Sequence, residues 1–208
     1  MNLLLNFGRG LIILLALIIG IVSLRYLDFK VSGLLSDKGA LLDSNLYLLG
    51  FYTHIIFGVI ALVTGPWQFI SRFRNRYLIF HRNLGKIYVL ACLLAGIAGF
   101  GIGFYAEGGL IGQLGFICLA ILWLYATLRA YKAIAEGNVR GHEGWMFRSY
   151  ALTLAAVTLR IWIPFFLAIL HWEFLDAYRI IAWLCWIPNL LVVEILIRVK
   201  SSYIFTAP

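Results

Sequence analysis

The sequence predicts an all-α protein, a polytopic bundle of about six transmembrane helices with both termini in the cytoplasm. Of its 208 residues, 63% are hydrophobic and only 12% are charged, and the mean hydropathy is +0.94. Soluble domains carry about 25% charged residues. Apolar runs of about 20 residues, long enough to cross a hydrocarbon core of about 30 Å, recur along the chain. Lysine and arginine gather at one end of these runs, which indicates the orientation.

We expect the spans near residues 10–27, 46–70, 82–105, 110–131, 145–170 and 178–198. The first follows Arg9, as in a signal peptide, but no small-residue cleavage site comes after it, so we interpret it as a spanning helix. The connection from Asp28 to Asn45 is the longest polar stretch and the one candidate for a loop with structure of its own. No repeat or soluble domain is evident, which predicts a single integral membrane domain over residues 1–208.

Basic residues determine the predicted orientation, because cytoplasmic loops are enriched in them. Twelve of the 17 lie on one side: Arg9, Arg72, Arg74, Arg76, Arg82, Lys86, Arg129, Lys132, Arg140, Arg148, Arg198 and Lys200. Four lie on the other side: Arg25, Lys30, Lys38 and Arg179. We therefore expect a multi-pass protein of the bacterial cytoplasmic (inner) membrane. The net charge of +8 sits at the ends of spans, so the predicted partner is the lipid bilayer and not nucleic acid. A membrane partner subunit or a homo-oligomer stays open.

The four histidines sort by depth. His81 and His142 begin the third and fifth spans at the cytoplasmic boundary. His54 and Arg160 lie about a third of the way in from the outer side, and His171 lies at the outer end of the fifth span. Ionisable groups at membrane depth are costly, so each is a functional-site hypothesis. The sequence predicts an inner pair, His81 with His142, and an outer group of His54 and Arg160 that His171 could join.

Three of these histidines open stripes of small or polar residues at helical spacing. The stripes are His54, Gly58, Ala61, Gly65, Gln68; His81, Gly85, Tyr88, Cys92, Gly96, Gly99, Gly103; and His142, Met146, Ser149, Thr153, Ala156, Arg160. In a continuous helix His142 and Arg160 would lie on one face, about five turns apart. Small residues let membrane helices approach closely without any ligand. The alternative is a slot for a flat cofactor or substrate, with histidines at its ends.

Several unusual blocks resemble the domain of unknown function 2306 family of membrane proteins. They are His54, residues 65–68 (GPWQ), 81–88 (HRNLGKIY), 142–152 (HEGWMFRSYAL) and 155–160 (AAVTLR). The resemblance covers about residues 50–165, a family-like core of about 46–170 that leaves the first and sixth spans peripheral. It implies that His54, His81, His142, Arg148 and Arg160 belong to the family's pattern, but it implies no particular activity.

A looser likeness is to transmembrane b-type cytochromes, in which histidines ligate haem between packed helices. Haem iron takes one or two axial imidazoles, which His81 and His142 could supply. Basic side chains such as Arg82 and Arg148 could neutralise the propionates. The candidate cofactor-binding residues are His54, His81, His142, Arg82, Arg148 and Arg160, with haem b as the cofactor.

The leading functional hypothesis is a b-type haem-binding or quinone-reactive electron carrier. The alternatives are a small proton-coupled transporter with His54 and Arg160 as its intramembrane site, and a non-catalytic accessory or assembly subunit of a membrane complex. A membrane metalloenzyme using His81, His142 and Glu143 is a further alternative. No nucleophile-plus-base motif, phosphate loop or dinucleotide fingerprint occurs. Glu194 is expected to pair with Arg198 one turn later.

Overall fold

The computed structural model describes residues 2–28 and 33–206, and within that part of the chain it is helical, without a β-strand. Six helical stretches of the described chain are long and apolar enough to cross a membrane. They are Gly10–Leu27, Asn45–Phe69, Leu78–Gly103, Gly109–Ala135, Val139–Ile169 and Phe174–Val199. These ranges confirm the predicted all-α fold and its six spans. The chain divides into two compact units, residues 1–104 and 105–208.

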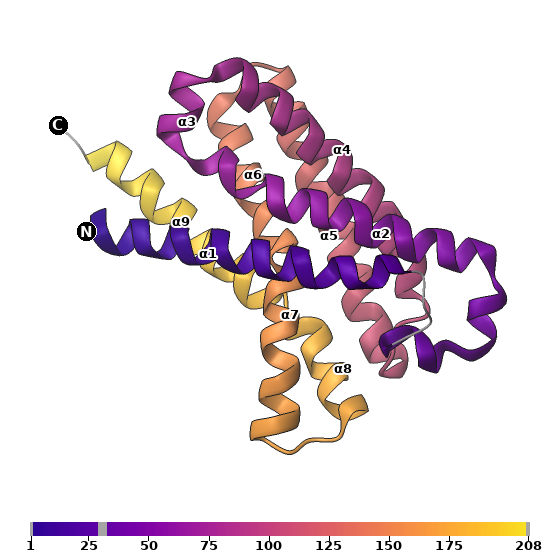
Figure 1. Cartoon of the computed structure of the whole chain (residues 1–208). Helices are drawn as coiled ribbons and strands as arrows, with labels where there is room; N and C mark the ends of the chain where they lie inside the picture. Colours follow the sequence, from indigo (N-terminus) through magenta and orange to yellow (C-terminus); the bar gives the residue numbers. More distant parts are fainter. Residues whose placement is uncertain (1, 29–32, 207–208) are drawn as a thin grey trace. The chain divides into compact units, whose positions relative to one another are not determined.

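The N-terminal unit contains three spanning helices and the short segments that join them (Figure 1). In chain order these are α1 (Asn2–Ser23), η1 (Leu24–Asp28), η2 (Gly33–Asp43), α2 (Asn45–Thr64), η3 (Pro66–Phe69), α3 (Ser71–Arg76) and α4 (Leu78–Gly103). Helix α2 packs along α4, and α1 packs against α2. The connection predicted to have structure of its own consists of 3₁₀ turns where it is described, and its residues 29–32 lie outside the described part of the chain.

The small-residue stripes explain why α2 and α4 pack closely. On α4, Cys92, Gly96 and Gly99 are buried. A Cβ atom added at Gly99 would lie 2.8 Å from Nδ1 of His54, and one added at Gly85 would lie 3.4 Å from Oε1 of Gln68. The start of α2 therefore lies against the end of α4, and the helices are antiparallel. Within this unit the two stripes serve close helix packing.

The C-terminal unit is built around the pair α5–α6. Its elements are α5 (Gly109–Ala135), α6 (Val139–Thr153), α7 (Ala155–Pro164), the π-helical turn η4 (Phe165–Ile169), α8 (Phe174–Leu184) and α9 (Ile187–Thr206). Helix α5 packs against α6 and α8, α7 packs against α8, and α9 packs against α6. Helices α7 and α8 form a hairpin at the bottom of Figure 1.

The sixth span is interrupted at Cys185 and Trp186, between α8 and α9. Pro188 is the physical cause. It has no N–H to donate to the carbonyl of Leu184, and its ring collides with that carbonyl in a continuous helix. The proline is tolerated because it lies in the first turn of α9, where backbone N–H groups have no helical partner.

The fifth span is interrupted at Leu154, although no glycine or proline lies there. The hydroxyl of Thr153 donates to the carbonyl of Ser149 at 3.0 Å, and that of Thr158 lies 3.1 Å from the carbonyl of Leu154. Such back-bonding to residue i−4 bends helices. The stripe expected from His142 to Arg160 is therefore divided between two helices, α6 and α7. The α6 part of the stripe is buried, as expected of a face turned to protein.

Candidate functional site

His142 lies in the first turn of α6, where a local cap and a tertiary hydrogen bond position it. The side chain of Asn138 accepts a hydrogen bond from the Gly141 N–H at 2.8 Å, which caps α6. The Nδ1 atom of His142 lies 2.9 Å from the carbonyl oxygen of Ala130 on α5. A carbonyl only accepts, so Nδ1 carries the proton and donates. In the neutral imidazole Nε2 then holds the lone pair, ready to bind a metal or accept a proton.

His54 has the same arrangement in the N-terminal unit. Its Nδ1 donates to the carbonyl oxygen of Ala95 on α4 at 2.9 Å. In each unit, therefore, a histidine ring is bonded to the backbone of the neighbouring helix. Histidines that ligate metals almost always donate their other ring N–H in this way, which fixes the tautomer and the ring orientation. Such a bond also holds two helices together without any ligand, α2 to α4 in one unit and α6 to α5 in the other.

The predicted histidine groups are divided between the two units, so both groups remain predictions. His81 opens α4 in the N-terminal unit, where its backbone N–H donates to the Tyr77 carbonyl at 2.9 Å and its Nδ1 is buried. His142 belongs to the C-terminal unit, and so do Arg160 and His171. His171 is exposed and has a positive φ of 54°, in the loop before α8.

A polar seam continues from His142 along the α5–α6 interface. The hydroxyls of Thr127 and Ser149, both fully buried, are 2.7 Å apart. Beyond them the indole N–H of Trp123 donates to the hydroxyl of Thr153 at 3.0 Å. These groups satisfy one another, which is what hydrocarbon surroundings demand of buried polar atoms. The seam aligns α5 and α6 and thereby fixes the carbonyl that holds His142.

Arg148 forms a bidentate ion pair with Glu194 of α9. Its Nε and Nη2 donate to the two carboxylate oxygens at 2.5 and 2.8 Å. The carboxylate expected to interact with Arg198 one turn later has Arg148 as its bidentate partner, because α9 packs against α6, and the charge of Arg198 acts on it as well. The Arg148 guanidinium also lies 4.6 Å from the ring centre of Trp145, and that of Arg129 lies 5.0 Å from the same centre. The indole therefore has two cationic neighbours.

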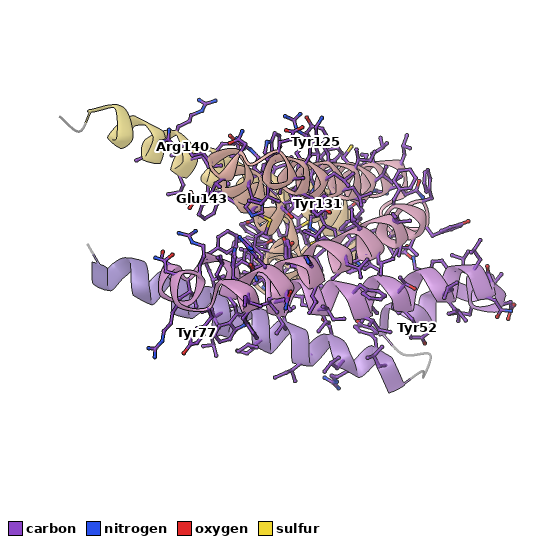
Figure 2. The ribbon with its side chains drawn as sticks, turned by 90° about the horizontal axis from the view of Figure 1, so that it is seen from above. Tyr52, Tyr77, Tyr125, Tyr131, Arg140 and Glu143 are labelled. Carbon is purple, nitrogen blue, oxygen red and sulfur yellow. The ribbon has the colours of Figure 1, made fainter. Side chains whose placement is uncertain are left out.

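Two basic residues near the starts of α4 and α6 are more accessible than Arg148, which lies further along α6. Arg82 in the first turn of α4 is exposed, and so is Arg140 in the first turn of α6. Figure 2 shows Arg140 and Glu143 at the start of α6, and Tyr125 and Tyr131 on α5. Exposed guanidinium groups can pair with phosphate or carboxylate groups without giving up a protein partner.

Arg160 lies on α7, beyond the break in the fifth span. Its Nη1 donates to the carbonyl of Ala156 on the same helix at 2.9 Å, and its side chain is half-buried. A carbonyl that already accepts within a helix has a second lone pair for such a bond. The charge is thus solvated locally by backbone, which lowers its cost at membrane depth.

The described residues hold no group of three or more His, Cys, Asp or Glu side chains that could bind a metal ion.

Two amides inside the protein, one half-buried and one buried, are not predicted as functional from the sequence. Asn189 at the start of α9 donates to the carbonyls of Ala151 and Cys185 at 3.2 and 3.0 Å. Gln68 is buried, and its Nε2 has no hydrogen-bond partner among the described residues. The available signal was an amide within or beside an apolar span, since polar groups there are costly.

The comparisons with known proteins identify the family. The family model "Predicted membrane protein (DUF2306)" matches residues 51–197. The match reaches further than the resemblance on residues 50–165, and it includes most of the sixth span, so the expectation that this span lies outside the family's region is wrong. No curated protein and no solved structure matches the chain. With most of its length and five of its six spans covered by that model, this multi-pass membrane protein belongs to the DUF2306 family.

Proposed function

We propose that this protein is a b-type haem-binding electron carrier of a bacterial cytoplasmic membrane, with His142 as an iron ligand. The observation that carries the proposal is the bond from His142 Nδ1 to the Ala130 carbonyl, 2.9 Å long. It leaves the Nε2 lone pair as the one site at which this imidazole can bind iron. Haem, when bound, supplies one-electron chemistry at its iron.

The surroundings of His142 fit an axial ligand. An iron-binding imidazole must be held in orientation, and the Ala130 carbonyl does this because it accepts the Nδ1 proton and so directs Nε2 of the neutral ring toward a ligand. Asn138 caps the turn that carries the ring, and the Thr127–Ser149 bond holds α5 and α6 in register. His54, bonded in the same way to Ala95, is a candidate for a further ligand.

The basic side chains near His142 and His81 also support the proposal, but the expected role of Arg148 as a propionate partner changes. Arg148 is held by Glu194, so it is a poorer partner for a propionate than the sequence indicated. Arg140 and Arg82 are exposed at helix starts and are better placed to pair with an anionic group. The orientation predicted from the basic residues puts His142, Arg140 and Arg82 on the cytoplasmic side.

Visible absorption tests the proposal directly. The protein is expressed with haem available, purified in detergent, and measured oxidised and after reduction with dithionite. We expect a Soret band and a sharp reduced α-band. His142→Ala should abolish or shift both bands, while His171→Ala, at an exposed loop position, should leave both unchanged. His54→Ala and His81→Ala, made separately, should identify a second axial ligand.

Two results would count against this function. If the wild-type protein were colourless, the remaining role of His142 would be structural, as the residue whose ring bonds α6 to α5. If both bands were unchanged in His142→Ala, His142 would not be the iron ligand, and another residue would have to be. A transporter would then be the better candidate, because both the fifth and sixth spans are interrupted and Arg160 lies just beyond one break. Interrupted helices commonly form substrate sites in transporters.

A further inference from the structure

The interruptions of the fifth and sixth spans meet at the side chain of Asn189. Its Nδ2 lies 3.2 Å from the Ala151 carbonyl on α6, 3.1 Å from the Thr158 hydroxyl on α7 and 3.0 Å from the Cys185 carbonyl at the end of α8. A residue in the first turn of α9 therefore contacts both sides of the other break. Carbonyls beside a break need such partners, because hydrocarbon offers none.

The donors at this junction are fewer than the acceptors. Asn189 has two amide hydrogens and Thr158 has one hydroxyl hydrogen. Besides Asn189, the Thr158 hydroxyl oxygen lies near the carbonyls of Leu154 at 3.1 Å and Ala155 at 3.3 Å, and close to that of Cys185. Three hydrogens cannot serve all of these acceptors at once. Each donor at this junction therefore has more than one acceptor within reach.

Helix α9 has a half-buried apolar face, which includes Leu190 and Val193, and polar contacts also hold it to α6. It packs against α6, and the face with Leu191, Val192, Ile195 and Leu196 is exposed. Its polar contacts include those of Asn189 at its base and of the Glu194 carboxylate, which binds Arg148. By contrast α8 is fitted tightly to α5, since a Cβ atom at Gly115 would lie 2.9 Å from that of Ala182. The rigid part is therefore α5, α6 and α8.

We propose that α9 is a hinged segment that swings at Cys185–Trp186, and that Asn189 and Glu194 latch it onto α6. Pro188 supplies the hinge, because it removes the backbone bond that would join α8 to α9. Release of the latch frees Arg148 and uncovers the side of α6 on which Arg148 and Ala151 contact α9. The hinge does not depend on the proposed haem, because neither Asn189 nor Glu194 is a candidate ligand.

Spin-label distances in nanodiscs test the hinge. Cys92, Cys118 and Cys185 are replaced by alanine, and labels are attached at exposed positions on α5 (Leu128) and α9 (Leu196). A reference pair joins Leu128 to Leu175 on α8, which is also exposed. We expect one narrow 128–196 distribution in the otherwise native protein. Glu194→Gln and Asn189→Leu should each broaden it or add a second distance, and the two together should do so more strongly. The 128–175 distance should not change.

Matched variants separate a latch from general loosening. Thr127→Val removes a buried hydroxyl bond between α5 and α6 and should leave the 128–196 distribution narrow. The charge exchange Arg148→Glu with Glu194→Arg should restore the narrow distribution lost in Glu194→Gln. Glu194→Gln is nearly isosteric, so it should fold even if the double variant does not. An unchanged 128–196 distribution in the folded latch variants would overturn the hinge, as would an equal change in the reference pair.

Discussion

Gly99 on α4 lies against the imidazole of His54 on α2, and the ring occupies the space that a side chain at position 99 would fill. A Cβ atom at Gly99 would come within 2.8 Å of Nδ1 and 3.0 Å of Cε1. The ring cannot simply move aside, because Nδ1 is bonded to the Ala95 carbonyl one turn earlier on the same helix. The contact joins a small-residue stripe to an intramembrane histidine, which are the two features that marked this region in the sequence.

Gly99→Ala should destabilise the protein by about 1–3 kcal/mol, the usual cost of overpacking. Gly101→Ala, in the same helix with nothing within 4 Å of the added Cβ, is the control and should be neutral or slightly stabilising. Thermal unfolding in detergent measures both. His54→Ala should rescue part of the Gly99→Ala loss, since the variants share one contact. If the losses of stability in Gly99→Ala and His54→Ala were strictly additive in the double variant, the His54 ring would not be the group that excludes a side chain at position 99.

Arg148→Gln should lower the free energy of unfolding by about 1–3 kcal/mol, because it leaves the Glu194 carboxylate half-buried without its bidentate partner. The control is Lys132→Gln. That lysine pairs with Glu136 at 3.7 Å with both side chains mostly exposed, so its loss should cost less than about 0.5 kcal/mol. Equal effects in the two variants would show that the Arg148 pair is no stronger than a surface pair.

Asn138→Ala should destabilise α6 at its start by about 1 kcal/mol, because the Gly141 N–H loses its cap. Asn138→Ser keeps an accepting oxygen and should retain most of the stability. Hydrogen exchange of the amides in the first turn of α6 is the measurement. If His142 binds haem, Asn138→Ala should also release haem faster than Asn138→Ser, since His142 lies in the frayed turn. Equal exchange in the two variants would exclude a capping role.

Single cysteines test the predicted orientation, in a background without the natural ones. The positions of Tyr105 and Trp172 should react with an impermeant thiol reagent in intact cells, since both are exposed in loops of the predicted outer side. The positions of Asn75 and Glu136, also exposed, should react only after permeabilisation. This follows from twelve basic residues on one side against four on the other. The reverse labelling would invert the sidedness of every site described above.

Much of the architecture was readable from local sequence. The number and approximate limits of the six spans followed from apolar runs, because partition into hydrocarbon depends on the sum of nearby residues. The burial of the small-residue stripes followed from helical spacing. Pro188 could have predicted the break in the sixth span, since its effect is local and steric. The break at Leu154 had a weaker signal, two threonines that bond back to their own helix.

By itself the sequence determined the class, the spans, the family blocks and the residues worth suspecting, since each depends on local composition, spacing or identity. Only the tertiary structure decided which side chains and backbone groups are hydrogen-bonded to one another. It showed Glu194 on Arg148, the carbonyls of Ala95 and Ala130 on the two histidines, and Asn189 across both breaks. A hydrogen bond requires two groups at about 2.9 Å, and residues far apart in the chain reach that distance only through helix packing. The tautomers of His54 and His142 are therefore properties of the packed helices.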